Sequence, residues 1–427
     1  MRPFCHVFSI LFPAILMIFL SGCFFVPQNH ISLYQRSVII EDTEKETSIL
    51  KKARLQKTND PSVNNIKILY LKGTPYEMGF QHGKLLMKDI KSNFGHIIKI
   101  IKLFATEDMM DEIYDLMAPY IPLEEKEEMR GLAHGADIPL KLIHWIHSIP
   151  EVSEYGKKKR FRNRFKFLNG SSCSNIVAFG KSTESGELYQ LRVLDWIRFL
   201  GAQKYPVIIV REPDVGNASV SFSFAGFIGC VTGMNEKKMA FGEMGYGSPS
   251  NESLEGIPFI FLYRKLMRET SNLSEATDMI IHSKRTCSYV YMISDAKIPY
   301  TETNSLLFVT DRDNVEMYPE NTYLEDRKKT RKYPAIDDIV YGGPKADILY
   351  QELTKNYGNI STSILMDITK KICLEENMQN VIFKPASLEA WVSNATRKKN
   401  EQGKACNQKW YYFNFGEALH SVRSQQF

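Results

Sequence analysis

This sequence of 427 residues has few cysteines, only a small excess of basic over acidic residues, and no recognisable cofactor motif. Seven cysteines are too few for a small scaffold held together by disulfides. None of them forms a Cys-x-x-Cys pair, so we expect no zinc site. No GxGxxG, Walker A or HExxH sequence stands where a nucleotide or a catalytic metal would need it. We therefore expect neither a metal nor a cofactor.

The charge balance and the apolar content exclude further classes of protein. The chain carries 54 basic and 49 acidic residues, and a net charge of +5 is too mild to indicate a nucleic-acid partner. Apolar residues make up 44% and charged residues 24%, which is ordinary for a globular protein. This composition excludes a wholly disordered chain and a polytopic membrane protein. The length allows two or three domains, or one large one.

The first 23 residues differ from the rest of the chain. Arg2 is followed by an apolar run at 7–20, which is short for a membrane-spanning helix of about 20 residues. A positive start, an apolar stretch and small residues are typical of a secretory signal. The sequence Leu-Ser-Gly-Cys that ends at Cys23 resembles the bacterial lipobox. We expect residues 1–22 to be a lipoprotein signal peptide and Cys23 to carry the lipid that anchors the exported protein to a bacterial cell membrane. Ordinary secretion and a retained membrane anchor are the alternatives.

The remaining chain divides into a polar tether at 23–62, an N-terminal helical part at 63–172 and a main part at 173–427. Thr74, Pro75 and Glu77 form a capping-box pattern that predicts a helix continuing to about Phe94. Further helices are predicted at 123–134, 258–269, 274–282, 344–357 and 361–373. Strands are predicted at 66–71, 176–179, 188–194, 207–210, 220–224, 238–241, 289–294, 305–309, 386–392 and 410–415. The expected fold class is α+β.

Cys173 is the first candidate for chemistry, because it opens a predicted hairpin after a run of small residues. Arg192 and Asp195 lie near the far end of the partner strand, so the hairpin returns them close to Cys173. An adjacent arginine lowers the pKa of a thiol and favours the thiolate nucleophile. The alternatives are a small core side chain for Cys173 and a mutual ion pair for Arg192 and Asp195.

No histidine is placed as an evident partner base. His82, His134, His144 and His147 precede Cys173 on helical stretches, and we interpret them as packing or surface residues. The other solution is a nucleophile at a chain terminus, whose own α-amine acts as the base. Its pKa of about 7.7–8.0 suits this role at neutral pH. That solution requires cleavage between Ser172 and Cys173.

Several segments in order resemble the cysteine N-terminal-nucleophile (Ntn) hydrolases, specifically the acyl-coenzyme A:6-aminopenicillanate acyltransferase family, which is related to the choloylglycine hydrolases. The segments are GTPYEMGFQHG at 73–83, MRGLAHGA at 129–136, the hairpin from Cys173-Ser174 through Gly180, Thr183 and Gly186 to Arg192 and Asp195, the sequence Gly233-Met234-Asn235-Glu236-Lys237, and Gly256-Ile257-Pro258 with Arg264. The resemblance spans roughly residues 64–395.

This resemblance implies a four-layer αββα fold and a precursor that cleaves itself before Cys173 into two chains that stay associated. Cys173 would then be the autoprocessing and catalytic nucleophile, and its freed amine the base. Arg192 and Asp195 match residues that hold and tune the cysteine, and Asn235 matches a donor to the oxyanion. Without the resemblance, Asn235 is better interpreted as a turn residue.

The sequence departs from the family pattern at three places. Arg192-Val193-Leu194-Asp195 replaces the commoner Arg-Asn-x-Asp. Val290 stands where many members have an asparagine, so the second oxyanion donor is absent, moved, or supplied by Tyr289 or Tyr291. Lys238 replaces a common glycine. These departures weaken the transfer of substrate specificity more than the assignment of the nucleophile.

The sequence therefore predicts a membrane-tethered, autoprocessing cysteine amidohydrolase or acyltransferase. It would act on a linear amide (C–N) bond of a small acylated amide or acyl donor, through an acyl-thioester. One alternative is a lipid-ester hydrolase resembling the phospholipase B-like proteins. Another is a non-catalytic surface lipoprotein that keeps the fold, which the departure at Val290 favours.

Overall fold

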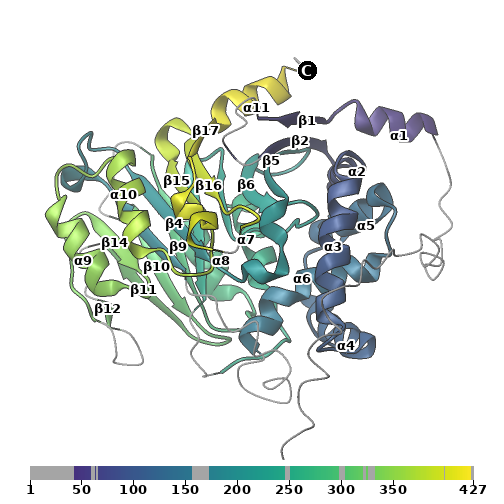
Figure 1. Ribbon diagram of the computed structural model, residues 1–427, viewed down its shortest axis with the longest axis horizontal. Coiled ribbons are helices and arrows are strands. Elements are labelled where there is room, and N and C mark those ends of the chain that lie inside the picture. Colours follow the sequence, from purple (N-terminus) through teal and green to yellow (C-terminus); the bar gives the residue numbers. More distant parts are fainter. Residues whose placement is uncertain are drawn as a thin grey trace, which may run out of the picture. The chain divides into compact units, whose positions relative to one another are not determined.

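Two β-sheets pack face to face at the centre of the protein in this computed structural model (Figure 1). The structure describes residues 43–58, 63, 66–155, 173–245, 251–297, 303–320, 324–325, 332–398 and 400–424. Of the sequence predictions, the signal peptide, the lipid site at Cys23 and the cleavage residue Ser172 lie outside the described residues.

The larger sheet has nine strands in the order β1-β2-β5-β6-β7-β8-β9-β10-β11, and only its β2–β5 pair is parallel. The second sheet has six antiparallel strands in the order β14-β3-β4-β15-β16-β17. The strands of the larger sheet are β1 Arg54–Lys57, β2 Lys67–Gly73, β5 Pro206–Pro213, β6 Ser219–Phe224, β7 Thr232–Asn235, β8 Met239–Gly245, β9 Tyr289–Asp295, β10 Ser305–Thr310 and β11 Val315–Pro319. Those of the second sheet are β3 Ser174–Ala178, β4 Tyr189–Asp195, β14 Ile339–Gly342, β15 Asn377–Lys384, β16 Glu389–Asn394 and β17 Tyr411–Asn414. A separate short pair is formed by β12 Leu324–Glu325 and β13 Lys332–Tyr333.

The continuous apolar run of β5 is explained by burial on both faces of its sheet. Alternate residues of a strand point to opposite faces. Ile208 and Val210 belong to an apolar cluster shared with the second sheet, whereas Val207 and Ile209 belong to the cluster that contains the helices. The inter-sheet cluster includes Phe222, whose ring lies 5.6 Å from that of Phe383. Both faces of the larger sheet are therefore covered.

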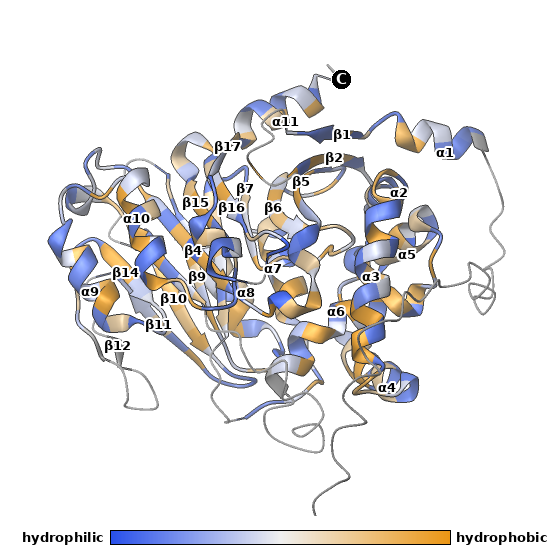
Figure 2. Cartoon of the chain, in the orientation of Figure 1, coloured by the Kyte–Doolittle hydropathy of each residue, from blue (hydrophilic) through white to orange (hydrophobic). Residues whose placement is uncertain are grey.

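Helices cover the outer faces of the two sheets. Helices α7 and α8 contact the larger sheet, and α9 and α10 contact the second sheet. Figure 2 shows hydrophobic residues on β9 and β10, and mixed faces on the helices around them. The helices are α1 Thr43–Leu50, α2 Pro75–Leu85, α3 Met87–Ile101, α4 Glu107–Met117, α5 Leu123–Ala136, α6 Leu140–Tyr155, α7 Phe259–Glu269, α8 Leu273–His282, α9 Ala346–Lys355, α10 Thr362–Ile372 and α11 Phe415–Arg423. The expected α+β class with an N-terminal helical region is confirmed.

Helices α2 and α5 of the N-terminal region touch backbone to backbone through four glycines. Gly79 and Gly83 lie one turn apart on α2, as do Gly131 and Gly135 on α5. A Cβ atom on Gly131 would lie 2.0 Å from the carbonyl oxygen of Tyr76, and one on Gly79 would come equally close to α5. Only glycine permits such an approach.

A buried ion cluster joins this helix pair to the sheet. The carboxylate of Glu128 on α5 lies 3.0 Å from Nε of Arg211 on β5 and 2.7 Å from Nη2 of Arg264 on α7. All three side chains are almost fully buried. The two guanidinium groups hold the pKa of Glu128 below its ordinary value despite the burial of its carboxyl, which opposes them.

The structure differs from the sequence predictions in four respects. The capping box at Thr74 and Glu77 is confirmed, but the predicted helix is two helices with a break at Leu86, where no proline or glycine signals it. Residues 43–57, assigned to the tether, contain α1 and the edge strand β1. Helices α4, α6 and α11 and strands β7, β11, β12, β13, β14 and β15 were not foreseen. Cys373 and Cys406 form a disulfide, a pairing that the sequence left open.

None of the helices in the described ranges combines the length and the apolar character needed to cross a membrane.

Replacing Gly131 with alanine should lower the free energy of unfolding by about 1–3 kcal/mol, the usual cost of an extra methyl group in a packed contact. Gly95→Ala is the matched control, since Gly95 also lies inside a helix but a Cβ atom there would meet nothing within 4 Å. We expect the control to gain about 0.5–1 kcal/mol, because alanine is the better helix former. Urea unfolding measures both, and a Gly131 variant as stable as the parent would contradict the backbone contact.

Candidate active site

Cys173 lies immediately before β3, at the open end of the β3–β4 hairpin. In this hairpin Ser174 pairs with Val193 and Asn175 pairs with Arg192. Strand β3 is buried along its whole length, and Cys173 itself is only 4% exposed. The predicted hairpin is therefore present, and its register places Cys173 beside the last residues of β4.

The guanidinium group of Arg192 joins the thiol to a carboxylate from the other sheet. Its Nη2 lies 3.3 Å from Sγ of Cys173 and 3.3 Å from Oε2 of Glu243 on β8. Nε and Nη2 also donate to the carbonyl oxygen of Glu243, at 3.3 and 3.2 Å. Arg192 is fully buried, so this contact is made out of reach of bulk water. The sequence did not identify Glu243, because only the packing of the two sheets brings β8 to β4.

Asp195 ends β4 and is held by the corner between α10 and β15. Its Oδ1 accepts hydrogen bonds from the main-chain N–H of Leu374 at 3.1 Å and from Nδ2 of Asn377 at 3.0 Å. The disulfide between Cys373 and Cys406 fixes the same corner, and the N–H of Cys406 donates to Oδ1 of Asn377. The second oxygen of Asp195, Oδ2, is buried and accepts no hydrogen bond from the residues that the structure describes.

Burial controls the ionisation of this group of residues. It raises the pKa of the Cys173 thiol to about 12, although the charge of Arg192 acts in the opposite direction. The negative charges of Glu243 and Asp195 add to the increase. Burial also raises the pKa of Asp195 to about 6, against the hydrogen bonds that it accepts. The thiol is therefore protonated at neutral pH.

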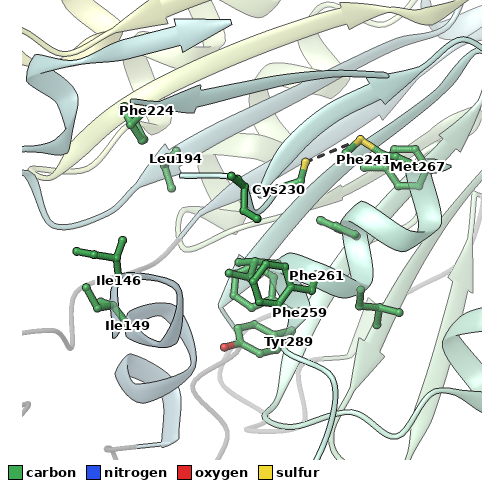
Figure 3. Close-up of a cluster of buried hydrophobic side chains, with 14 of the residues drawn as sticks. Ile146, Ile149, Leu194, Phe224, Cys230, Phe241, Phe259, Phe261, Met267 and Tyr289 are labelled. Carbon is green, nitrogen blue, oxygen red and sulfur yellow. Dashed lines mark hydrogen bonds between the residues drawn. The ribbon is translucent and has the colours of Figure 1, made fainter. Parts of the chain in front are cut away.

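Cys173 and Glu243 open onto an apolar pocket of about 840 Å³, counting the space at its mouth. The other lining residues are Asn93, Phe94 and Ile97 of α3; Ile146, Ile149, Pro150 and Ser153 of α6; and Leu194, Trp196, Leu200, Ala202, Ser223, Phe224, Phe227, Val231, Phe259 and Tyr289. Figure 3 shows Ile146 and Ile149 on their helix, with Leu194, Phe224, Phe259 and Tyr289 on neighbouring segments. Most of these side chains are apolar.

The structure does not bring Asn235 to the thiol, and this corrects the sequence prediction. Asn235 ends β7 at the turn into β8. Glu243 lies four residues beyond Met239, the first residue of β8, which is about 13 Å along that strand. Its Nδ2 donates to the carbonyl oxygens of Met267 and Thr270, and its Oδ1 accepts two main-chain N–H groups. Both of its donor hydrogens are thus used in holding the β7–β8 turn.

Val290 occupies the position on β9 where the family pattern led us to look for an asparagine, and its buried side chain has no donor. Of the two tyrosines beside it, Tyr289 lines the pocket and Tyr291 is fully buried. The hydroxyl of Tyr289 lies 3.2 Å from Oε2 of Glu151.

The described residues contain no group of three or more histidine, cysteine, aspartate or glutamate side chains arranged to hold a metal ion.

Two comparisons place these features among known proteins. Protein dcd1A of Dictyostelium discoideum is 27% identical over 351 residues, which cover 73% of this chain and 75% of that protein. Among solved structures, an N-acylethanolamine-hydrolyzing acid amidase ortholog of Caenorhabditis elegans matches with a TM-score of 0.38 and 12% identity, over 56% of this chain and 100% of that one. Penicillin V acylase from Agrobacterium tumefaciens matches with a TM-score of 0.36 and 10% identity, over 57% and 87%. TM-scores this low do not by themselves establish a common fold.

A family model gives a more direct match. The model of the acyl-coenzyme A:6-aminopenicillanic acid acyl-transferase family matches residues 182–306. This segment begins after Cys173 and contains Arg192, Asp195 and Glu243. The resemblance predicted from the sequence is thus confirmed, because residues 182–306 match the model of the acyl-coenzyme A:6-aminopenicillanic acid acyl-transferase family.

Proposed function

We propose that the protein is an Ntn-type cysteine amidohydrolase or acyltransferase that cleaves itself between Ser172 and Cys173 and then acts on acyl amides. The observation that carries this proposal is the position of Cys173, whose Sγ faces an apolar pocket and lies 3.3 Å from a buried arginine. A pocket of this kind suits the hydrocarbon part of an acyl group, and the thiol at its wall suits attack on the acyl carbon. The two sheets with helices on both outer faces are consistent with the αββα fold of these enzymes.

Self-cleavage would give the unreactive thiol of Cys173 a base, namely the α-amine that the cleavage frees on the same residue. Sγ of Cys173 attacks the carbonyl carbon of Ser172, and the C–N bond between the two residues breaks to give a thioester and a free amine. Water then hydrolyses the thioester, which leaves a carboxylate on residue 172 and restores the thiol. Because Oδ2 of Asp195 is buried beside this end of β4 without a described donor, it is available to accept a hydrogen bond from the new amine.

Substrate turnover would use the same atoms. The amine takes the proton of the Cys173 thiol as Sγ attacks the substrate carbonyl, and it delivers this proton to the leaving nitrogen as the C–N bond breaks. Water, or an acceptor amine in a transferase, then attacks the acyl-thioester, and the proton returns to sulfur. Arg192 stabilises the thiolate and Asp195 stabilises the ammonium group, so the charge-separated pair is favoured on both sides. We propose no oxyanion role for Asn235, since both of its donors are occupied.

The two products of cleavage would remain associated, because buried polar contacts join them. Glu128 lies before the cleavage point, and its partners Arg211 and Arg264 lie after it. The lipid on Cys23 would tether this pair of exported chains to a bacterial cell membrane.

The apolar pocket also suits the acyl chain of a lipid ester, which is the second candidate function. Amide and ester substrates with the same acyl group distinguish the two candidate functions. Because the pocket binds the acyl group equally in both substrates, any difference in rate reflects the bond that is cleaved. A non-catalytic protein would bind such acyl groups without releasing a product.

Self-cleavage is expected to appear as two chains, the second of which begins at Cys173. Cys173→Ala should remain a single chain, because alanine has no nucleophile for the acyl shift. The matched control is Cys230→Ala, which removes another buried free thiol that lies outside the pocket lining and should leave cleavage intact. Intact-mass spectrometry after expression in an exporting bacterial host measures both. A wild-type protein that stays in one piece would overturn the proposal.

Glu243→Gln should shift the ionisation of the nucleophile to lower pH. The Glu243 carboxylate raises the thiol pKa of Cys173, so its removal should lower that pKa. The rate of Cys173 alkylation by iodoacetamide, measured against pH on the cleaved protein, should therefore rise at a lower pH than in the wild type. Glu187→Gln, at a surface carboxylate paired with Lys384, should leave the profile unchanged. A shift to higher pH in Glu243→Gln would contradict the charge argument.

The catalytic efficiency should increase with the length of the acyl chain until the pocket is filled. Each buried methylene is worth about 0.8 kcal/mol, so kcat/KM should rise roughly fourfold per methylene. Fatty-acyl amides of aminomethylcoumarin with even chains from acetyl to palmitoyl test this by fluorescence, alongside the matching esters of hydroxymethylcoumarin. Efficient turnover of the esters with no turnover of the amides would favour the lipid-ester hydrolase instead.

A further inference from the structure

Helix α6 carries two buried polar residues, His147 and Glu151, that the proposed chemistry does not use. They lie four residues apart and therefore on the same face of the helix. Their exposed fractions are 1% and 0%. A buried polar side chain must be matched by hydrogen-bond partners, and the partners of these two lie in different walls of the apolar pocket.

His147 holds the loop between β6 and β7. Its Nδ1 lies 2.8 Å from the carbonyl oxygen of Ile143, which identifies Nδ1 as the donor and leaves Nε2 as an acceptor. The main-chain N–H of Ile228 donates to Nε2 at 3.0 Å. The imidazole ring also stacks on the ring of Phe227, with centroids 5.0 Å apart and planes inclined by 6°. Phe227 lines the pocket, so His147 fixes this wall by one hydrogen bond and one ring contact.

Two other helices of the N-terminal region hold the same loop. Nδ2 of Asn93 on α3 donates to the carbonyl oxygen of Ala225, and the N–H of Gly226 donates to Nε2 of His82 on α2, each at 3.0 Å. Burial lowers the pKa of His82 to about 3 and that of His147 to about 4, so both rings are neutral and able to accept at neutral pH. Side chains of α2, α3 and α6 therefore hold this loop by hydrogen bonds to the main chain of Ala225, Gly226 and Ile228.

Glu151 holds another part of the lining. One carboxylate oxygen accepts the main-chain N–H of Phe259 at 2.6 Å, and the other accepts the hydroxyls of Thr286 at 2.6 Å and Tyr289 at 3.2 Å. Phe259 and Tyr289 both line the pocket, and their rings lie 4.2 Å apart. The carboxylate therefore fixes the start of α7 and the start of β9 at one point.

Helix α6 is also a wall of the pocket, through Ile146, Ile149 and Pro150. We propose that His147 and Glu151 are positioning residues that set the width of the apolar pocket, and so select the length and branching of the acyl chain it accepts. This inference rests on the proposed function for its substrate class. It also implies that the segment before Cys173 continues to determine selectivity after self-cleavage, since α6 belongs to that segment.

His147→Phe and Glu151→Met test the inference, because each keeps the size and apolar contacts of the side chain and removes its acceptors. Glu151→Gln is the conservative rescue, since an amide oxygen can still accept from Phe259. His144→Phe is the matched control on the same helix. The ring of His144 stacks on Tyr114 of α4, with centroids 3.7 Å apart, and it does not line the pocket.

The first readout is acyl-chain binding, which does not require catalysis. In the Cys173→Ala background, cis-parinaric acid is displaced by saturated fatty acids of 8–18 carbons and by branched acids, so that the profile of affinity against chain shape is obtained. His147→Phe and Glu151→Met are expected to weaken the preferred acid by about tenfold, as when one buried donor loses its acceptor, and to flatten the profile. His144→Phe and Glu151→Gln should retain the wild-type profile.

The second readout is the split between KM and kcat for the acyl aminomethylcoumarins. The positioning variants should raise KM for the preferred chain and change the order of preference, with kcat nearly unchanged. If His147→Phe and Glu151→Met lose thermal stability but keep the wild-type profile of chain lengths, the residues are structural only and the inference is overturned. A wild-type protein that binds fatty acids selectively without hydrolysing amides would refute the proposed function and leave the binding test of His147 and Glu151 valid.

Discussion

The burial of the Arg192 guanidinium between the two sheets is the constraint on which the candidate site depends. A guanidinium group cannot be removed from water unless other groups accept its hydrogen bonds and balance its charge. The carbonyl oxygen and the carboxylate of Glu243, on the strand that faces it, accept hydrogen bonds from Nε and Nη2 and balance the charge, whereas Nη1 is buried with no acceptor among the described residues. Gly242 makes the approach possible, because a Cβ atom there would lie 2.9 Å from Cγ of Arg192 and 2.2 Å from Oδ1 of Asn175. The contact between the two sheets therefore also determines the environment of the thiol.

The same burial explains why the thiol would stay protonated, and so unreactive, before the proposed cleavage. Desolvation outweighs the attraction of Arg192 and keeps the pKa of Cys173 high. Asp195, with its own pKa raised by burial, has one oxygen without a described donor. An amine at the start of a chain beginning with Cys173 would meet both needs, since its cation would stabilise the Asp195 carboxylate while it removes the proton from sulfur. If the proposed cleavage occurs, charges that are costly before it would become complementary after it.

The N-terminal helices contribute more than a covering layer. The contact through Gly79 and Gly131 brings α2 and α5 together so closely that Glu128 is fully buried and must find partners in the sheet and in α7. The neutral rings of His82 and His147 serve the loop beside the pocket in the same way. The contacts of Glu128, His82 and His147 each join a residue before position 173 to one after it. A single break in the chain would leave all of them in place.

The sequence was a good guide where the evidence is local, and a poor one where it depends on packing between distant elements. The capping box at Thr74, the hairpin that carries Cys173 and the pairing of that residue with Arg192 follow from short-range patterns, and all are present in the structure. Glu243 was missed because a glutamate in a strand carries no signal of what lies across the sheet interface. Asn235 was misplaced for the complementary reason: a motif gives the order of residues but not the direction of a side chain, and the turn takes both of its amide hydrogens.

The histidines show how the two kinds of evidence combine. Sequence reasoning interpreted His82 and His147 as packing residues, and their neutral, fully buried rings agree with that interpretation. A ring that only filled space, however, would not need a nitrogen, and each ring accepts a main-chain N–H from the same loop. Phenylalanine would fill these positions at no cost in desolvation, whereas histidine is expensive to bury unless its acceptor is used. By accepting these N–H groups, the two rings fix the position of the loop at the pocket wall.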